Sequence, residues 1–106
     1  MPRYLFVGNY SPQGAKGILS GGGTARRAAI EKMVSDLGGR LETFDFAFGS
    51  DDVYTIVELP DARTATAIAL AVNGSGAINL RTVVLMTPEE VDAAGQIQAN
   101  YQPPGS

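Results

Sequence analysis

The sequence predicts an α+β domain, in which a four-stranded antiparallel sheet carries helices on one of its faces. Two observations lead to this prediction. In the stretch 44–60, two arms of aromatic and β-branched residues flank the polar turn 49–52, which is typical of a β-hairpin. On either side of the hairpin lies a helical segment, with a further strand-like segment beyond it. The predicted order is strand, helix, strand, strand, helix, strand.

The first strand is predicted over residues 3–10, and the dipeptide Ser11-Pro12 ends it with a turn. Residues 12–23 contain several glycines, each of which weakens a helix by about 1 kcal/mol relative to alanine. We therefore expect one helical turn followed by a flexible break. The glycine run 21–23 is a connector in this interpretation, because no Gly-Lys-Ser/Thr follows it to form a phosphate loop.

The first long helix is predicted to begin at Thr24, which is a favoured N-cap residue. Apolar residues then recur at i, i+3, i+4 and i+7, which places them on one face of a helix. That stripe consists of Ile30, Met33, Val34 and Leu37. The glycines at 38–39 end the helix. The hairpin strands follow at 40–47 and 53–59, and Pro60 ends the second because it has no N–H to donate.

The second half of the chain has equally clear boundaries. Asp61 is predicted to cap an alanine-rich helix that runs through Val72, and residues 77–86 have the β propensity of a last strand. Thr87 and Pro88 begin a short terminal helix, with two acidic residues in its first turn.

This order of elements is that of a ferredoxin-like domain, which we place at residues 1–94, followed by a flexible C-terminal tail at 95–106. The alternation of side chains makes both faces of the sheet largely apolar, whereas two crossover helices can cover only one face. We expect a second copy of the chain to cover the other face, in a homodimer with a two-fold axis. The alternative is that the terminal helix folds over that face within one chain.

The composition excludes several classes of protein. The chain is 44% hydrophobic and 18% charged with a formal net charge of −3, so it is globular and lacks the basic patch that nucleic-acid binding requires. No apolar run suits a membrane span or an export signal, and we expect a cytoplasmic protein that does not bind membranes. Histidine and cysteine are absent, which excludes His/Cys metal sites and Ser-His-Asp or Cys-His triads. We predict no metal ion and no cofactor.

Polar residues on otherwise apolar strands are the candidates for a site, because a buried polar group requires a partner. They are Tyr4, Asn9, Tyr10, Asp45, Tyr54, Asn79 and Arg81. Asp45 and Tyr54 lie on neighbouring arms of the hairpin and are candidate catalytic residues: desolvation in an apolar pocket would raise the pKa of Asp45 and suit it to act as a base. We favour the other interpretation, in which the pair braces a dimer interface.

The hairpin tip offers a second candidate. Asp51 and Asp52 could bind a hard cation, but adjacent carboxylates at a turn point in different directions, and we interpret them as solvated turn residues.

Several short pieces, in the same order, resemble the GYD domain family of the dimeric α/β-barrel superfamily. The matching pieces are residues 10–17 (YSPQGAKG), 37–42 (LGGRLE), 48–53 (FGSDDV) with the strand that follows to residue 61, and the alanine-rich helix that ends at 75–76. The tyrosine of the family's namesake motif falls where Asp51 stands here, whereas Gly49 and Asp52 are retained. The resemblance implies a ferredoxin-like subunit that dimerises sheet to sheet.

Three functions remain open at this point. The first is a homodimer that binds a small apolar molecule or acts as an interaction module, for which we propose Asn9, Phe44, Phe46 and Arg81 as ligand-binding residues. The second, which the wider superfamily suggests, is a cofactor-free monooxygenase or isomerase whose pocket for a small aromatic substrate contains Phe44, Phe46, Tyr54 and Asp45. The third is a higher homo-oligomer in which the tail acts as a strap.

Overall fold

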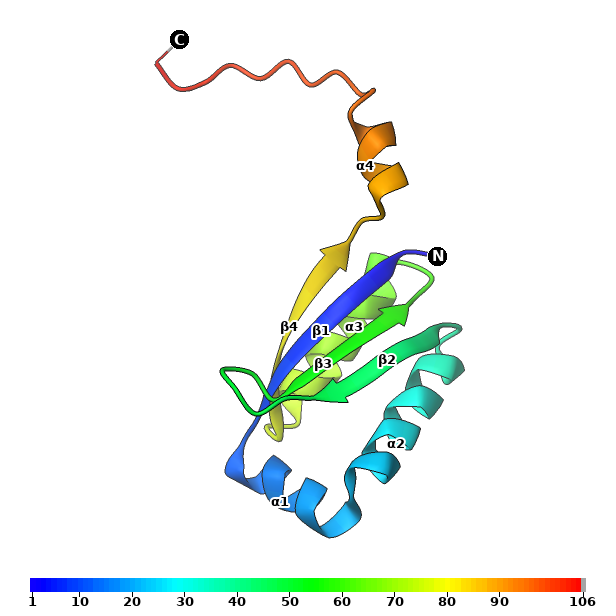
Figure 1. Cartoon of the computed structure of the whole chain (residues 1–106), viewed down its shortest axis with the longest axis vertical. Coiled ribbons are helices and arrows are strands. Elements are labelled where there is room, and N and C mark those ends of the chain that lie inside the picture. The colour runs from blue at the N-terminus through cyan, green and yellow to red at the C-terminus, as the bar shows by residue number, and fades with distance from the viewer. Residues whose placement is uncertain (106) are drawn as a thin grey trace.

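The chain follows the predicted order of elements over residues 1–105, which the structure describes. The elements of this computed structural model are β1 (Arg3–Tyr10), α1 (Pro12–Gly21), α2 (Gly23–Asp36), β2 (Arg40–Phe46), β3 (Val53–Glu58), α3 (Ala62–Gly74), β4 (Ile78–Leu85) and α4 (Pro88–Ala94). The strands form one antiparallel sheet in the order β2-β3-β1-β4 (Figure 1). The predicted α+β, ferredoxin-like fold is confirmed.

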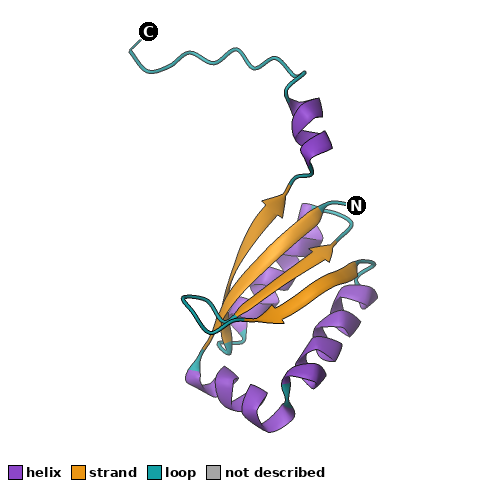
Figure 2. Ribbon diagram, viewed as in Figure 1, coloured by secondary structure: helices purple, strands orange, loops and turns teal. Residues whose placement is uncertain are grey.

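The core lies between the sheet and the two long helices α2 and α3; in Figure 2, α3 lies behind the sheet and α2 runs beside β2. Every second residue of each strand points to this face, because successive side chains of a strand alternate between its two sides. The buried residues of the core are Tyr4, Phe6, Val34, Val57, Leu59, Ala65 and Ile68. Full burial of one large apolar side chain contributes about 1.5–3 kcal/mol, and these residues hold both helices on the same face of the sheet.

Residues 12–21 form the helix α1, so the prediction of one helical turn and a flexible break is wrong. The Ser11 hydroxyl caps the helix by accepting a hydrogen bond from the Gly14 N–H at 3.1 Å, and the Ser11 N–H donates to the Ala77 carbonyl oxygen at 2.9 Å. A Cβ atom on Gly14 would lie only 2.1 Å from that same oxygen. Glycine is therefore required where α1 approaches the start of β4, and this contact offsets its low helix propensity.

The junction of α1 and α2 is also built on glycine. Gly22 separates the helices with a φ of 87°, which favours glycine, and it is the N-cap of α2 in place of the predicted Thr24. A Cβ atom on Gly23 would lie 2.9 Å from the ring of Phe46, so this position brings α2 close to β2.

Two helix starts agree with the sequence. Asp61 caps α3 by accepting a hydrogen bond from the Thr64 N–H at 2.8 Å. Thr87 and Glu90 form a capping box at the start of α4, in which each side chain accepts a hydrogen bond from the other residue's backbone N–H.

The face of the sheet opposite α2 and α3, which we call the open face, points toward the viewer in Figure 1 and carries no helix from residues 1–105. Helix α4 projects beyond the end of β4, and residues 95–105 continue away from the sheet. The alternative in which the terminal helix folds over this face is therefore wrong for the described chain. None of the helices found between residues 1 and 105 has the length and apolar character needed to cross a membrane.

Candidate functional site

An apolar strip runs along the middle of the open face. Leu5 and Val7 of β1 point to this face, because Tyr4 and Phe6, with which they alternate, point into the core on the other side. The register of the sheet places Ile56 of β3 and Val83 of β4 on either side of Leu5. Leu5, Ile56 and Val83 are partly exposed on this strip, and no helix of the described chain covers them. Val7 is itself buried.

A polar group lies at one end of this strip, where the hairpin loop meets the sheet. The Asp51 carboxylate accepts a hydrogen bond from the Asn9 amide at 2.8 Å, and the Arg81 guanidinium and the Tyr54 hydroxyl each lie 3.4 Å from its other oxygen. We call these four residues the Asp51 cluster. It brings together β1, β3, β4 and the loop between β2 and β3, and it includes two of the predicted ligand-binding residues, Asn9 and Arg81.

The Asp51 carboxylate is held in its charged form by these contacts. The hydrogen bond from Asn9 is the main cause that lowers the pKa of Asp51; partial desolvation opposes it and the positive charge of Arg81 supports it. The Asp51 side chain, which forms an ion pair with Arg81, is only 18% exposed to solvent. The carboxylate is therefore part of the sheet surface rather than a free group at a loop tip.

Asp52 ties the loop to the sheet on the same side of the molecule. Its carboxylate accepts a hydrogen bond from the Tyr10 N–H at 2.9 Å, and its own N–H donates to the Gly8 carbonyl oxygen at 2.9 Å. The interpretation of Asp51 and Asp52 as solvated turn residues is wrong, because both carboxylates have partners on β1. Among residues 1–105, no group of three or more acidic side chains is arranged to hold a metal ion.

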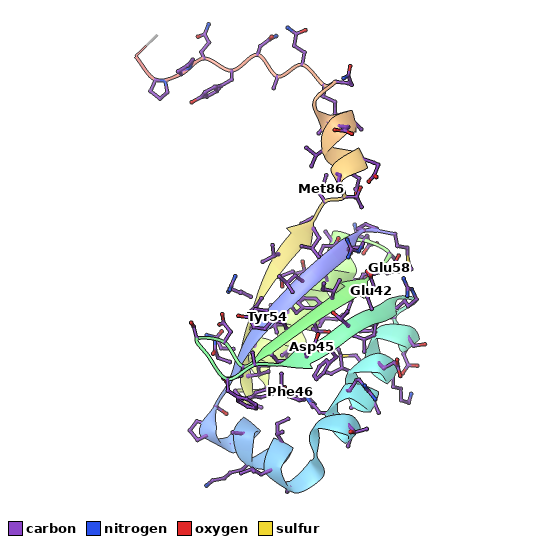
Figure 3. All side chains as sticks on the ribbon, viewed as in Figure 1. Glu42, Asp45, Phe46, Tyr54, Glu58 and Met86 are labelled. Carbon is purple, nitrogen blue, oxygen red and sulfur yellow. The ribbon has the colours of Figure 1, made fainter. Side chains whose placement is uncertain are left out.

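The predicted pair Asp45 and Tyr54 stands directly opposite across β2 and β3 (Figure 3). The hydroxyl of Tyr54, however, has its hydrogen-bond partner in Asp51, and Asp45 is exposed to solvent. The apolar pocket on which the catalytic hypothesis depends is not formed around Asp45 within one chain.

Phe44 and Phe46, the other two predicted ligand-binding residues, lie on the opposite side of the sheet from Asp45. Their rings pack edge to face at 5.3 Å between centroids, and Phe46 also lies 6.4 Å from the ring of Tyr10. The four residues proposed for one substrate pocket, these two with Asp45 and Tyr54, therefore do not come together. Strand alternation already separates Phe44 and Phe46 from Asp45, which stands between them in the sequence.

A narrow apolar slot of about 40 Å³ lies on the helix side of the sheet, between α2 and α3. Its walls include Phe6 and Phe44 from the sheet, Ile30 from α2 and Ile68 from α3. Its lining is apolar except for a few groups, among which are Tyr10 and Arg26.

A wider groove of about 430 Å³ adjoins the slot beneath α1, and we call it the α1–α2 groove. Tyr10 and Arg26 line both the groove and the slot. Small residues form much of the remaining wall: Gly14 and Gly17 from α1, Ala25 and Ala29 from α2, and Ala77 before β4. A volume of this size is within the range of sites that bind small molecules.

Arg26 was not among the predicted site residues, although a signal for it is present in the sequence. It lies four residues before Ile30, so it extends the apolar stripe of α2 by one turn and faces the sheet rather than solvent. A charged residue on the apolar face of a helix indicates either an oppositely charged partner within the protein or a binding site. Burial raises the pKa of the neighbouring Tyr10 phenol, and Arg26 lowers it by a smaller amount.

The family model described as GYD domain matches residues 4–94, which is most of the chain. Neither the curated proteins nor the solved structures provide a match.

Proposed function

Because the chain belongs to the GYD domain family, we propose that it acts as a homodimer that binds a small apolar molecule. In this dimer the open faces of two copies pack against each other. The observation that carries the proposal is the apolar strip of the open face, centred on Leu5 and Ile56, which the chain's own helices leave uncovered. Burial of this strip against an identical strip removes apolar surface from water, which favours association.

The polar groups around the strip support the same proposal. Arg3 and Glu42 form an ion pair of 2.7 Å at one end, and Asp51 is paired with Arg81 at the other. These charges already have partners within the chain, so a second copy can cover them without leaving a buried charge unpaired. Among residues 1–105, every fully buried polar side-chain atom has a hydrogen-bond partner.

The segment beyond β4 supports association independently. Residues 86–105 form an arm that extends away from its own sheet (Figure 3). Its large apolar side chains are exposed, although such residues are usually buried. They are Met86, Val91, Ile97 and Tyr101. In the proposed dimer, this arm packs against the partner.

The dimer is tested by the solution mass, measured by light scattering over a dilution series. We expect a mass of two chains or a multiple. The variant Ile56→Asp places a carboxylate in the proposed interface and should weaken association by about 100-fold or more. Leu70→Asp is the matched control, because Leu70 is exposed on α3, on the other side of the molecule. Circular dichroism would verify that both variants fold.

A mass of one chain at every concentration would contradict the dimer. Unchanged association of Ile56→Asp would show that the interface lies elsewhere.

The proposal that the protein binds a ligand is based on the slot and the α1–α2 groove: both have largely apolar linings, and the groove has a suitable volume, on the side of the sheet that the dimer leaves free. Small aromatic probes such as 2-naphthamide and 2-naphthoate should therefore shift the amide NMR signals of residues that line the groove, including Ala25 and Ala29. If no probe shifts these signals at millimolar concentration, the binding function is wrong, whatever the oligomeric state.

A further inference from the structure

We infer that the α1–α2 groove selects a small organic anion, a carboxylate attached to an apolar body, and that Arg26 and Tyr10 hold the carboxylate. This inference rests on the proposed binding function and specifies the chemical class of the ligand. The apolar body of the ligand points into the slot, and its carboxylate lies where the slot and the groove meet.

The charge of the groove is the first argument. Arg26 is the one charged residue among those that line it, and no acidic side chain lines it. A groove lined by one cationic and no acidic side chain is unexpected in a chain with a formal net charge of −3. A ligand with a negative charge complements this wall, whereas a cation does not.

The state of Arg26 is the second argument. The ion pairs found within residues 1–105 involve Arg3, Lys32, Arg40 and Arg81, so Arg26 has no carboxylate partner there. Arg26 is nevertheless partly buried, in contrast to the exposed Arg27 beside it. A guanidinium that is partly withdrawn from water gains from an anionic partner, and its planar set of donors matches the two oxygens of a carboxylate.

Tyr10 supplies a second donor at the same place. Its hydroxyl stays protonated at neutral pH, because the ordinary pKa of a phenol lies well above 7 and burial raises the pKa of Tyr10 further, against a smaller opposing effect of Arg26. A protonated phenol and a guanidinium on one wall together provide hydrogen-bond donors to an anion.

The glycines of α1 are the third argument. Gly17 and Gly21 lie in a helix, where glycine is unfavourable, and a Cβ atom at either position would meet no atom within 4 Å. The packing of this chain therefore does not require glycine at these two positions, in contrast to Gly14. Both line the groove, and the absence of a side chain leaves its volume free for a ligand.

The inference is tested by titrating the full chain with 2-naphthoate and with the uncharged 2-naphthamide, followed by NMR. We expect the carboxylate to bind at least about 10-fold more tightly than the amide. Arg26→Met keeps most of the side-chain length without the charge, and it should remove this difference by weakening the carboxylate alone. Arg27→Met is the control: it makes the same change on α2 at a residue that does not line the groove.

Gly17→Ala provides a test in which weaker binding cannot be attributed to loss of folding. The added methyl group narrows the groove, so binding of both probes should weaken several-fold, whereas the thermal stability of the protein should rise.

The possible outcomes are distinct. Equal binding of the two probes, or an unchanged preference in Arg26→Met, would overturn the inference and leave the apolar binding function in place. Absence of binding by both probes, and by the smaller acids phenylacetate and 3-phenylpropionate, would overturn the inference together with the binding function. Undiminished binding by Gly17→Ala would place the ligand outside the groove.

Discussion

The same substitution at two glycines of α1 should change stability in opposite directions. Replacement of glycine by alanine inside a helix stabilises it by about 1 kcal/mol, and this gain applies to Gly14 and Gly17 alike. The two glycines differ in what surrounds them in the structure. A Cβ atom at position 17 would meet nothing within 4 Å, whereas at position 14 it would lie 2.1 Å from the Ala77 carbonyl oxygen.

The obstacle at position 14 is a backbone atom, which cannot rotate away as a side chain can. Overpacking costs about 1–3 kcal/mol, and we place this case at the upper end, so Gly14→Ala should lose about 2 kcal/mol after the helix propensity is counted. Gly17→Ala should gain about 1 kcal/mol. Since about 1 kcal/mol shifts the midpoint of a domain of this size by about 4–8 °C, the two midpoints should move apart in opposite directions.

Thermal unfolding followed by circular dichroism measures the midpoints, and urea titration gives the free energies of unfolding. If Gly14→Ala stabilised the protein as much as Gly17→Ala, α1 would not approach the start of β4, and the groove that depends on this contact would have a different shape.

Two further predictions concern the sheet. Because the pKa of Asp51 is lowered in the folded state, its ionised carboxylate stabilises the protein above the ordinary pKa of an aspartate, near pH 4, and this contribution is lost as the pH falls below that value. Asp51→Asn should therefore reduce the fall in the free energy of unfolding with decreasing pH. If the pH profiles of the variant and the unchanged chain were parallel, the Asp51 cluster would contribute nothing. Phe46→Asp should lower the free energy of unfolding, measured by urea titration, by about 3 kcal/mol or more, because it removes the ring that packs against Phe44 and Tyr10 and puts a charge beside them. A decrease of less than about 1 kcal/mol would contradict this packing.

Local signals in the sequence were sufficient for most of the fold. The Asp61 cap, the Thr87 capping box and the alternation along the strands each depend on residues within a few positions of one another, so a single sequence contains all the information needed.

The contacts that the sequence did not reveal are long-range. Glycine is required at position 14 because the Ala77 carbonyl oxygen lies close to it, and Asp51 is held in place by the hydrogen bond from Asn9. Both partners are distant in the sequence, so neither role can be predicted before the strands are paired. The same limit applies to the α1–α2 groove. Arg26 and Tyr10 come from different elements, and they indicate a site only because both line this groove in the folded chain.

The position of β1 in the centre of the sheet has a consequence for synthesis of the chain. β1 is made first, but its hydrogen-bonding neighbours β3 and β4 lie at residues 53–58 and 78–85. One edge of β1 therefore remains unpaired on the ribosome until β3 has been translated, and the other until β4 has been translated near the end of the domain. Folding that depends on such distant pairings is slow compared with helix formation. The first strand to be translated is thus among the last to be completed, and during that interval it is the segment of the nascent chain most exposed to aggregation.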